Sequence, residues 1–177
     1  MAIRNVFEHA FKLAQNIENL QVEDVKRELT DNPDVLLIDI RELQEVIDKG
    51  TIPGSKHAPR GMLEFWADPA SPYARDYFGE HKRTIVFCAG GGRSVYAVKA
   101  LEDMGFTNVA HLATGFGGWA GAGERIEDVS KSSRWVRRTE SDAPVAATIG
   151  QTWRQRRSHT GPLGRRTTAT NPNQLTT

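Results

Sequence analysis

The chain has one thiol, and it stands where a nucleophile could be activated. Cys88 is the only cysteine among 177 residues and follows an apolar run that ends at Phe87. A loop of small residues and the start of a helical pattern come next: Ala89, Gly90, Gly91, Gly92, Arg93 and Ser94. A cysteine between a buried strand and a helix lies where open α/β sheets bind their ligands.

Three features of this segment favour a thiolate over a thiol. Glycines let successive backbone N–H groups point at one spot, because no Cβ obstructs the turn. The helix N-terminus adds about half a positive charge, and Arg93 can add a full one. Such surroundings can lower the pKa of a cysteine from about 8.5 into the range of about 3.5–7.5. The segment therefore predicts an anion cradle with a nucleophile at its base.

Two other interpretations of the same residues remain open. A lone cysteine at a strand end can be an inert, buried side chain. A glycine-rich turn between a strand and a helix can also bind phosphate without using a cysteine. The nucleophile is favoured because the combination of strand, thiol, glycines, arginine and helix is more specific than any one part.

The elements that position this segment are read from the hydrophobic periodicity. Apolar runs at 35–39 and 84–87 predict buried parallel strands, and shorter strands are expected at 56–58 and 108–112. Helices are expected at 3–17, 22–29, 42–50, 60–66, 71–78, 93–105 and 115–123. This alternation indicates an α/β domain with a mostly parallel sheet and helices on both faces.

The first helix is amphipathic and can be used in two ways. Its apolar residues recur at spacings of three and four: Ile3, Val6, Phe7, Ala10, Phe11, Ala14 and Ile17. We expect this face to pack on the domain. The alternative is a helix that forms a homodimer or binds a partner.

Composition separates a folded body from a basic tail. Residues 1–123 carry 13 Lys and Arg against 17 Asp and Glu, whereas residues 124–177 carry 10 against 5. No apolar run approaches the roughly 20 residues that span a bilayer, and the N-terminus lacks the apolar core of a signal peptide. One cysteine cannot form an internal disulfide, which predicts a cytoplasmic protein. The tail is expected to be flexible, and its WRQRR stretch is a weak candidate for nucleic-acid contact.

The ordered motifs of residues 20–123 resemble those of a single-domain rhodanese, of the sulfurtransferase superfamily. The resemblance rests on LLIDIREL (Leu36–Leu43), GTIPGSKHAPRGMLEF (Gly50–Phe65), IVFCAGGGRS (Ile85–Ser94) and ALEDMGFTNVAHLATGFGGW (Ala100–Trp119). It implies a five-stranded, mainly parallel sheet. The expected organisation is an N-terminal helix at 1–19, a rhodanese-like domain at 20–123 and the basic tail at 124–177.

The resemblance also implies roles for individual residues. Cys88 matches the nucleophile that holds a sulfane sulfur as a persulfide, and the residues from Gly90 to Ser94 match the loop whose amides surround that sulfur. Asp39 and Arg41 match a pair that braces this loop, and Arg60 begins the segment near the mouth of the site. Thr51 stands where the family often has histidine, at a position expected to be structural.

Arg93 has two possible roles at the start of the helix. It can hold an anionic donor with its planar guanidinium. We favour the second role, in which it braces the loop by pairing with Asp39, because Asp39 ends a buried strand and would need a partner.

The expected function is transfer of a sulfane sulfur, from a donor such as thiosulfate to cyanide or a thiol, through a persulfide on Cys88. A sulfur relay to a protein acceptor shares this chemistry. A binding module of this family usually lacks the cysteine. A phosphatase or arsenate reductase of this fold has five residues between cysteine and arginine, whereas four intervene here.

No metal or cofactor is expected. The histidines are scattered without metal-ligand spacing and are expected at surface or packing positions: His9, His57, His81, His111 and His159. Trp66 and Trp119 are expected in the core or at its rim.

Overall fold

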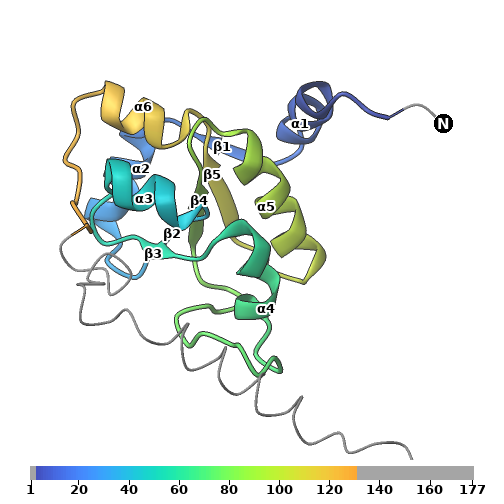
Figure 1. The fold of residues 1–177 in the computed structure, drawn as a ribbon. Coiled ribbons are helices and arrows are strands. Elements are labelled where there is room, and N and C mark those ends of the chain that lie inside the picture. The colour runs from blue at the N-terminus through green and yellow to red at the C-terminus, as the bar shows by residue number, and fades with distance from the viewer. Residues whose placement is uncertain (1–2, 131–177) are drawn as a thin grey trace, which may run out of the picture. The chain divides into compact units, whose positions relative to one another are not determined.

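A parallel sheet of five strands forms the centre of the fold (Figure 1). The computed structural model describes residues 3–130 of the chain. The strands are β1 (Glu18–Leu20), β2 (Leu36–Asp39), β3 (Lys56–His57), β4 (Thr84–Phe87) and β5 (Val109–Leu112). They lie in the order β1-β5-β4-β2-β3, and every neighbouring pair is parallel. The predicted parallel α/β sheet is thus confirmed.

Helices cover both faces of this sheet, as predicted. They are α1 (Val6–Ala14), α2 (Val22–Asp31), α3 (Leu43–Lys49), the short 3-10 helix η1 (Arg60–Met62), α4 (Leu63–Ala67), α5 (Gly92–Asp103) and α6 (Gly115–Gly121). Figure 1 shows α2, α3 and α6 on one side of the strands, with α4 and α5 on the other. None of the helices in residues 3–130 is long and apolar enough to cross a bilayer.

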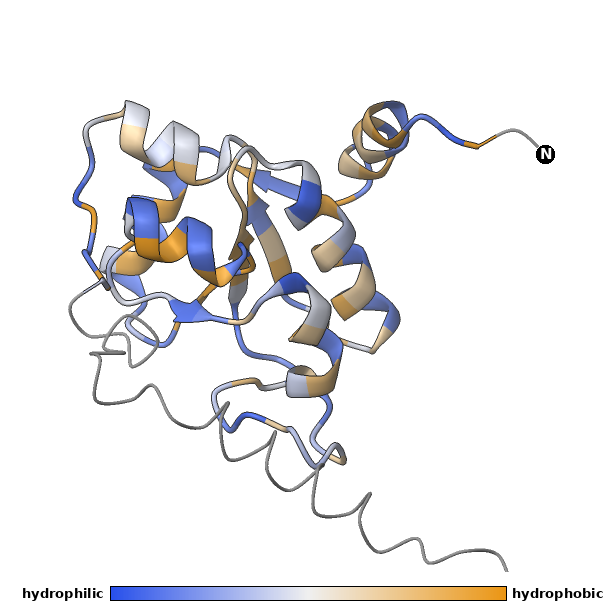
Figure 2. Cartoon of the chain, viewed as in Figure 1, coloured by the Kyte–Doolittle hydropathy of each residue, from blue (hydrophilic) through white to orange (hydrophobic). Residues whose placement is uncertain are grey.

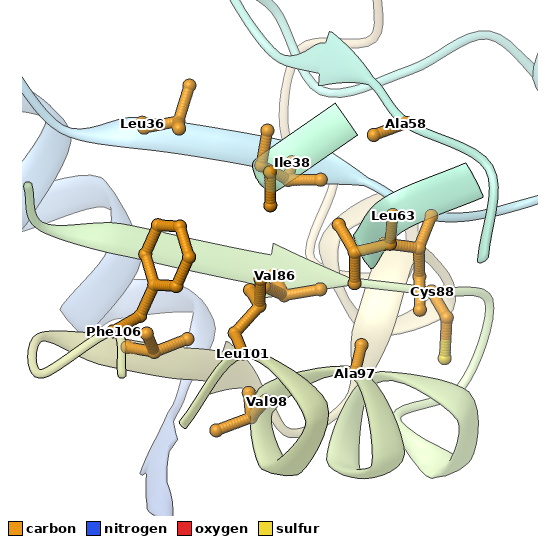
Figure 3. Close-up of a cluster of buried hydrophobic side chains, with 13 residues drawn as sticks. Leu36, Ile38, Ala58, Leu63, Val86, Cys88, Ala97, Val98, Leu101 and Phe106 are labelled. Carbon is orange, nitrogen blue, oxygen red and sulfur yellow. The ribbon is translucent and has the colours of Figure 1, made fainter. Parts of the chain in front are cut away.

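The two faces of the sheet bury separate hydrophobic clusters, because successive side chains of a strand point to opposite sides. Ile38, Val86 and Cys88 lie in the cluster under α4 and α5 (Figure 3). Leu37 and Phe87 lie in the other cluster. Figure 2 shows β5, inside the sheet, as mainly apolar, whereas the edge strands β1 and β3 are hydrophilic. The alternation therefore decides which helix layer Cys88 faces.

One predicted helix is wrong. Residues 71–78 form a series of turns. The Ala74 N–H donates to the Ser71 carbonyl, while the Arg75 N–H donates to the carbonyl of Trp66 at 2.9 Å. The Arg75 guanidinium also lies 4.6 Å from the centre of the Trp66 ring. These contacts with a distant residue replace the bonds that a helix would make within the segment.

The fifth strand, β1, was not located from the sequence. Only Leu20 of its three residues is buried, so the segment carries little hydrophobic pattern. Its pairing with β5 makes it a strand. The domain boundaries remain predictions, and the basic tail beyond residue 130, with WRQRR and His159, lies outside the described residues.

The first helix packs against α5. The Tyr96 hydroxyl donates to the Val6 carbonyl at 3.1 Å and lies 3.1 Å from His9 Nδ1. The Asn5 side chain caps α1 by accepting the N–H groups of Phe7 and Glu8. Packing of α1 on the domain is thus seen, yet Phe7 and Phe11 stay 81% and 69% exposed.

Candidate active site

Cys88 is the first residue after β4 and is buried on the face covered by α4 and α5 (Figure 3). Its side chain lies in a cluster with Val86, Leu63 and Ala97. Its carbonyl oxygen accepts the Phe116 N–H at 2.7 Å. The strand end and α6 together therefore hold the backbone of the thiol-bearing residue.

Gly91 brings a backbone donor to the sulfur. Its N–H donates to Cys88 Sγ at 3.2 Å, and it is the N-cap of α5, which begins at Gly92. Its φ is +90°, in the left-handed region, and a Cβ there would overlap the carbonyl oxygen of Ala113. Glycine is required at this position because only glycine combines this backbone with so close an approach.

Replacing Gly91 with alanine is expected to slow persulfide formation by about tenfold and to lower the free energy of unfolding by about 2 kcal/mol. The loop must move to relieve the overlap, and the N–H then leaves the sulfur. Gly90→Ala is the matched control, because a Cβ at Gly90 would meet nothing within 4 Å. Equal rates of persulfide formation in the two variants, measured by intact mass, would contradict this role.

Arg93 pairs with Glu45, and the predicted pairing with Asp39 is wrong. Its Nη1 and Nη2 donate to Glu45 Oε2 and Oε1 at 2.7 and 2.8 Å. The bond from Arg93 is the main cause that lowers the pKa of Glu45 to about 2. The same bond raises the pKa of Arg93, and the nearby Cys88 adds to that rise. This ion pair links the start of α5 to the first turn of α3.

Asp39 and Arg41 form a buried pair that braces the turn at Gly50 and Thr51. Arg41 Nη2 donates to Asp39 Oδ2 at 2.6 Å and to the Gly50 carbonyl at 2.7 Å. Thr51 Oγ1 donates to the same Asp39 oxygen at 2.7 Å. The expected direct bracing of the 88–93 loop is therefore wrong, because the hydrogen bonds recorded for both side chains go to the turn and to each other.

The Asp39–Arg41 pair still reaches the site through an aromatic ring. The Arg41 guanidinium carbon lies 3.9 Å from the centre of the Phe116 ring. The backbone N–H of Phe116 donates to the Cys88 carbonyl. Arg41 Nη1 is buried and has no hydrogen-bond partner in residues 3–130. The charge of the guanidinium is thus balanced by Asp39 on one side and by an aromatic face on another.

Ser94 and His111 connect the Cys88 loop to the sheet through polar contacts. Ser94 Oγ lies 2.8 Å from the Gly91 carbonyl and 3.0 Å from His111 Nδ1. His111 Nε2 lies 2.8 Å from Asn19 Oδ1. The amide nitrogen of Asn19 donates to two carbonyls, so its oxygen accepts from Nε2–H. Burial lowers the pKa of His111, while the single hydroxyl proton of Ser94 is donated to the Gly91 carbonyl.

The sequence did not predict the roles that Glu45 and His111 have at the site. Glu45 looked like an ordinary helix residue, and its signal was only a carboxylate in the first turn of α3. His111 was expected at a surface or packing position, because the histidines show no metal-ligand spacing. Arg60 pairs with Glu64 at 2.7 Å on the α4 side. No group of three or more metal-ligand side chains gathers within the described part of the chain.

A pocket of about 400 Å³ opens beside Cys88. The loop contributes Ala89, Gly90 and Gly92, and α5 contributes Arg93 and Tyr96. Helix α1 also lines the pocket, through Val6, Phe7 and Ala10. A larger cavity of about 680 Å³ lies between residues 67–80 and 104–106 and does not include Cys88. Of these two cavities, the thiol-side pocket is the one that contains Cys88.

The family model of the rhodanese-like domain matches residues 21–122. The chain belongs to this family. The match covers the sheet from β2 to β5, the Cys88 loop and the helices from α2 to α6. The predicted resemblance is thereby confirmed, and α1 and β1 precede the matched range.

The chain is similar to a curated relative and to two solved structures. A sulfurtransferase of Allochromatium vinosum is 27% identical over 104 residues, which are 59% of this chain and 89% of that protein. A Rhodopseudomonas palustris protein of unknown function, described as a possible tyrosine phosphatase, is 42% identical with a TM-score of 0.67; the match covers 72% of this chain and 97% of that one. A thiosulfate sulfurtransferase of Pseudomonas aeruginosa is 27% identical with a TM-score of 0.57. That match covers 69% of this chain and 22% of the Pseudomonas aeruginosa chain. The rhodanese-like domain here is thus similar to domains of sulfurtransferases.

Proposed function

We propose that this protein is a sulfurtransferase that carries sulfane sulfur as a persulfide on Cys88. The observation that carries the proposal is the Gly91 N–H, which donates to Cys88 Sγ at the floor of an open pocket. A backbone donor and the N-terminus of the 12-residue helix α5 both favour negative charge on that sulfur. The cysteine is therefore suited to act as a thiolate and to hold an ionised persulfide.

The transfer proceeds in two displacements. With thiosulfate as donor, the Cys88 thiolate forms an S–S bond to the outer sulfur, the S–S bond of thiosulfate breaks, and its electron pair leaves with sulfite. An acceptor such as cyanide then attacks the outer sulfur of the persulfide. Thiocyanate forms and the Cys88 thiolate is regenerated. A thiol, or the thiol of a partner protein in a relay, can take the sulfur in the same way.

Phosphate ester hydrolysis is the second candidate, because one relative is described as a possible tyrosine phosphatase. Two observations disfavour it. Four residues separate Cys88 from Arg93, which leaves a tighter loop than the family's phosphatases have. Both terminal nitrogens of Arg93 already donate to Glu45, so a phosphate dianion would have to compete with that carboxylate for the guanidinium.

Intact mass spectrometry tests the proposal directly. The protein is incubated with thiosulfate or inorganic polysulfide and desalted, and we expect its mass to rise by one sulfur atom. Cyanide should reverse the gain and release thiocyanate. The same preparation should not hydrolyse p-nitrophenyl phosphate. An unchanged mass with both donors, together with phosphate release, would favour the phosphatase instead.

A further inference from the structure

The outer wall of the Cys88 pocket comes from a helix that precedes the family domain. The family match begins at residue 21, whereas α1 spans Val6–Ala14. Figure 1 shows α1 beside α5, where the Tyr96 hydroxyl binds the Val6 carbonyl. This contact sets Val6, Phe7 and Ala10 along the pocket. The part of the site that this chain adds to its family's domain is therefore apolar.

The polar side chains of the pocket lining, Arg93 and Tyr96, already have hydrogen-bond partners. Arg93 makes two hydrogen bonds to Glu45, which balances its charge. The Tyr96 hydroxyl is bound to the Val6 carbonyl and lies near His9. The other lining residues are apolar or glycine. A doubly charged donor finds backbone N–H groups here, but among the lining side chains it finds no unpaired cation.

The apolar wall is open to solvent. Phe7 is 81% exposed and Val6 is 57% exposed. The pocket volume of about 400 Å³ lies within the roughly 300–1,000 Å³ typical of small-molecule sites. A ligand that covers these side chains removes apolar surface from water, which favours binding.

We propose that Cys88 exchanges sulfur with a small thiol that has an apolar body, which rests on the sulfurtransferase function proposed above. As donor the molecule is the persulfide R–S–SH. The Cys88 thiolate bonds to the outer sulfur, the S–S bond breaks, and the electron pair leaves on R–S⁻, which takes up a proton. As acceptor, R–S⁻ attacks the outer sulfur of the Cys88 persulfide and restores the thiolate. In both directions the apolar group R packs between Phe7 and the loop.

The test compares an apolar and a polar acceptor on the same loaded protein. Full-length protein is loaded with inorganic polysulfide, desalted, and mixed with 2-phenylethanethiol or 2-mercaptoethanol, and loss of the extra sulfur is followed by intact mass. We expect 2-phenylethanethiol to react about tenfold faster, because it buries its ring against the wall. Phe7→Ser should reduce that ratio to about twofold. Phe11→Ser is the matched control, since Phe11 is exposed on the same helix but does not line the pocket.

Each outcome separates this inference from the function on which it rests. A protein that gains no sulfur in the loading step overturns the sulfurtransferase function and the inference with it. A loaded protein that reacts equally fast with both thiols overturns the inference alone, as does an unchanged ratio in Phe7→Ser. Loss of the preference in Phe11→Ser as well would assign the effect to α1 as a whole, such as contact between two copies, and would also overturn it.

Discussion

Replacing Cys88 with serine is expected to reduce sulfur transfer by at least about a thousandfold and to abolish the sulfur adduct. A serine hydroxyl does not ionise in this setting and attacks sulfur poorly. The donors that favour a thiolate, the Gly91 N–H and the start of α5, cannot make up for the lost nucleophile. Thiocyanate release and intact mass measure the two effects on the same samples.

The control for this variant is its stability. Cys88 is buried, and an exchange of sulfur for oxygen changes the volume little, so the free energy of unfolding should fall by about 1 kcal/mol or less. A Cys88→Ser protein that is folded and retains a tenth or more of the wild-type rate would show that the sulfur is carried elsewhere or not at all.

Replacing Asp39 with asparagine is expected to lower the free energy of unfolding by about 3–5 kcal/mol, the range typical when one partner of a buried ion pair is lost. The guanidinium of Arg41 is fully buried and would keep its charge without a counter-ion. Asparagine also offers one acceptor oxygen where Asp39 offers two, to Arg41 and to Thr51. Urea denaturation measures the change.

The matched control is Glu45→Gln, which breaks the exposed pair with Arg93. The side chains of Glu45 and Arg93 are 28% and 39% exposed, so we expect the free energy of unfolding to fall by about 1 kcal/mol. Because pairing lowers the pKa of Glu45 from 4.5 to about 2, this contribution is full above pH 4.5 and is lost as the pH falls toward 2. Asp39→Asn combined with Arg41→Met should be more stable than Asp39→Asn alone. If Asp39→Asn lowers the free energy of unfolding no more than Glu45→Gln does, the role of Asp39 in a buried ion pair is contradicted.

Much of the site could be predicted because its parts are adjacent in the chain. Cys88, its glycine loop and the first residues of α5 form one continuous segment, so the order of strand, thiol and helix can be read directly. The same holds for the parallel sheet, since the buried runs at 35–39 and 84–87 are short, apolar and separated by helices. Local periodicity carries this information before any tertiary contact is known.

Tertiary structure alone decided which distant residues meet at the site. The partner of Arg93 is a carboxylate 48 positions away, whereas the local pattern favoured Asp39 because that residue ends a buried strand. The turns at 71–78 likewise follow from Trp66, and β1 is a strand only because β5 lies beside it. The apolar face of α1 was visible in the sequence, but its place over Cys88 depends on the contact with Tyr96. Side-chain partners and pocket walls are set by how the elements pack, and short-range spacing does not encode that packing.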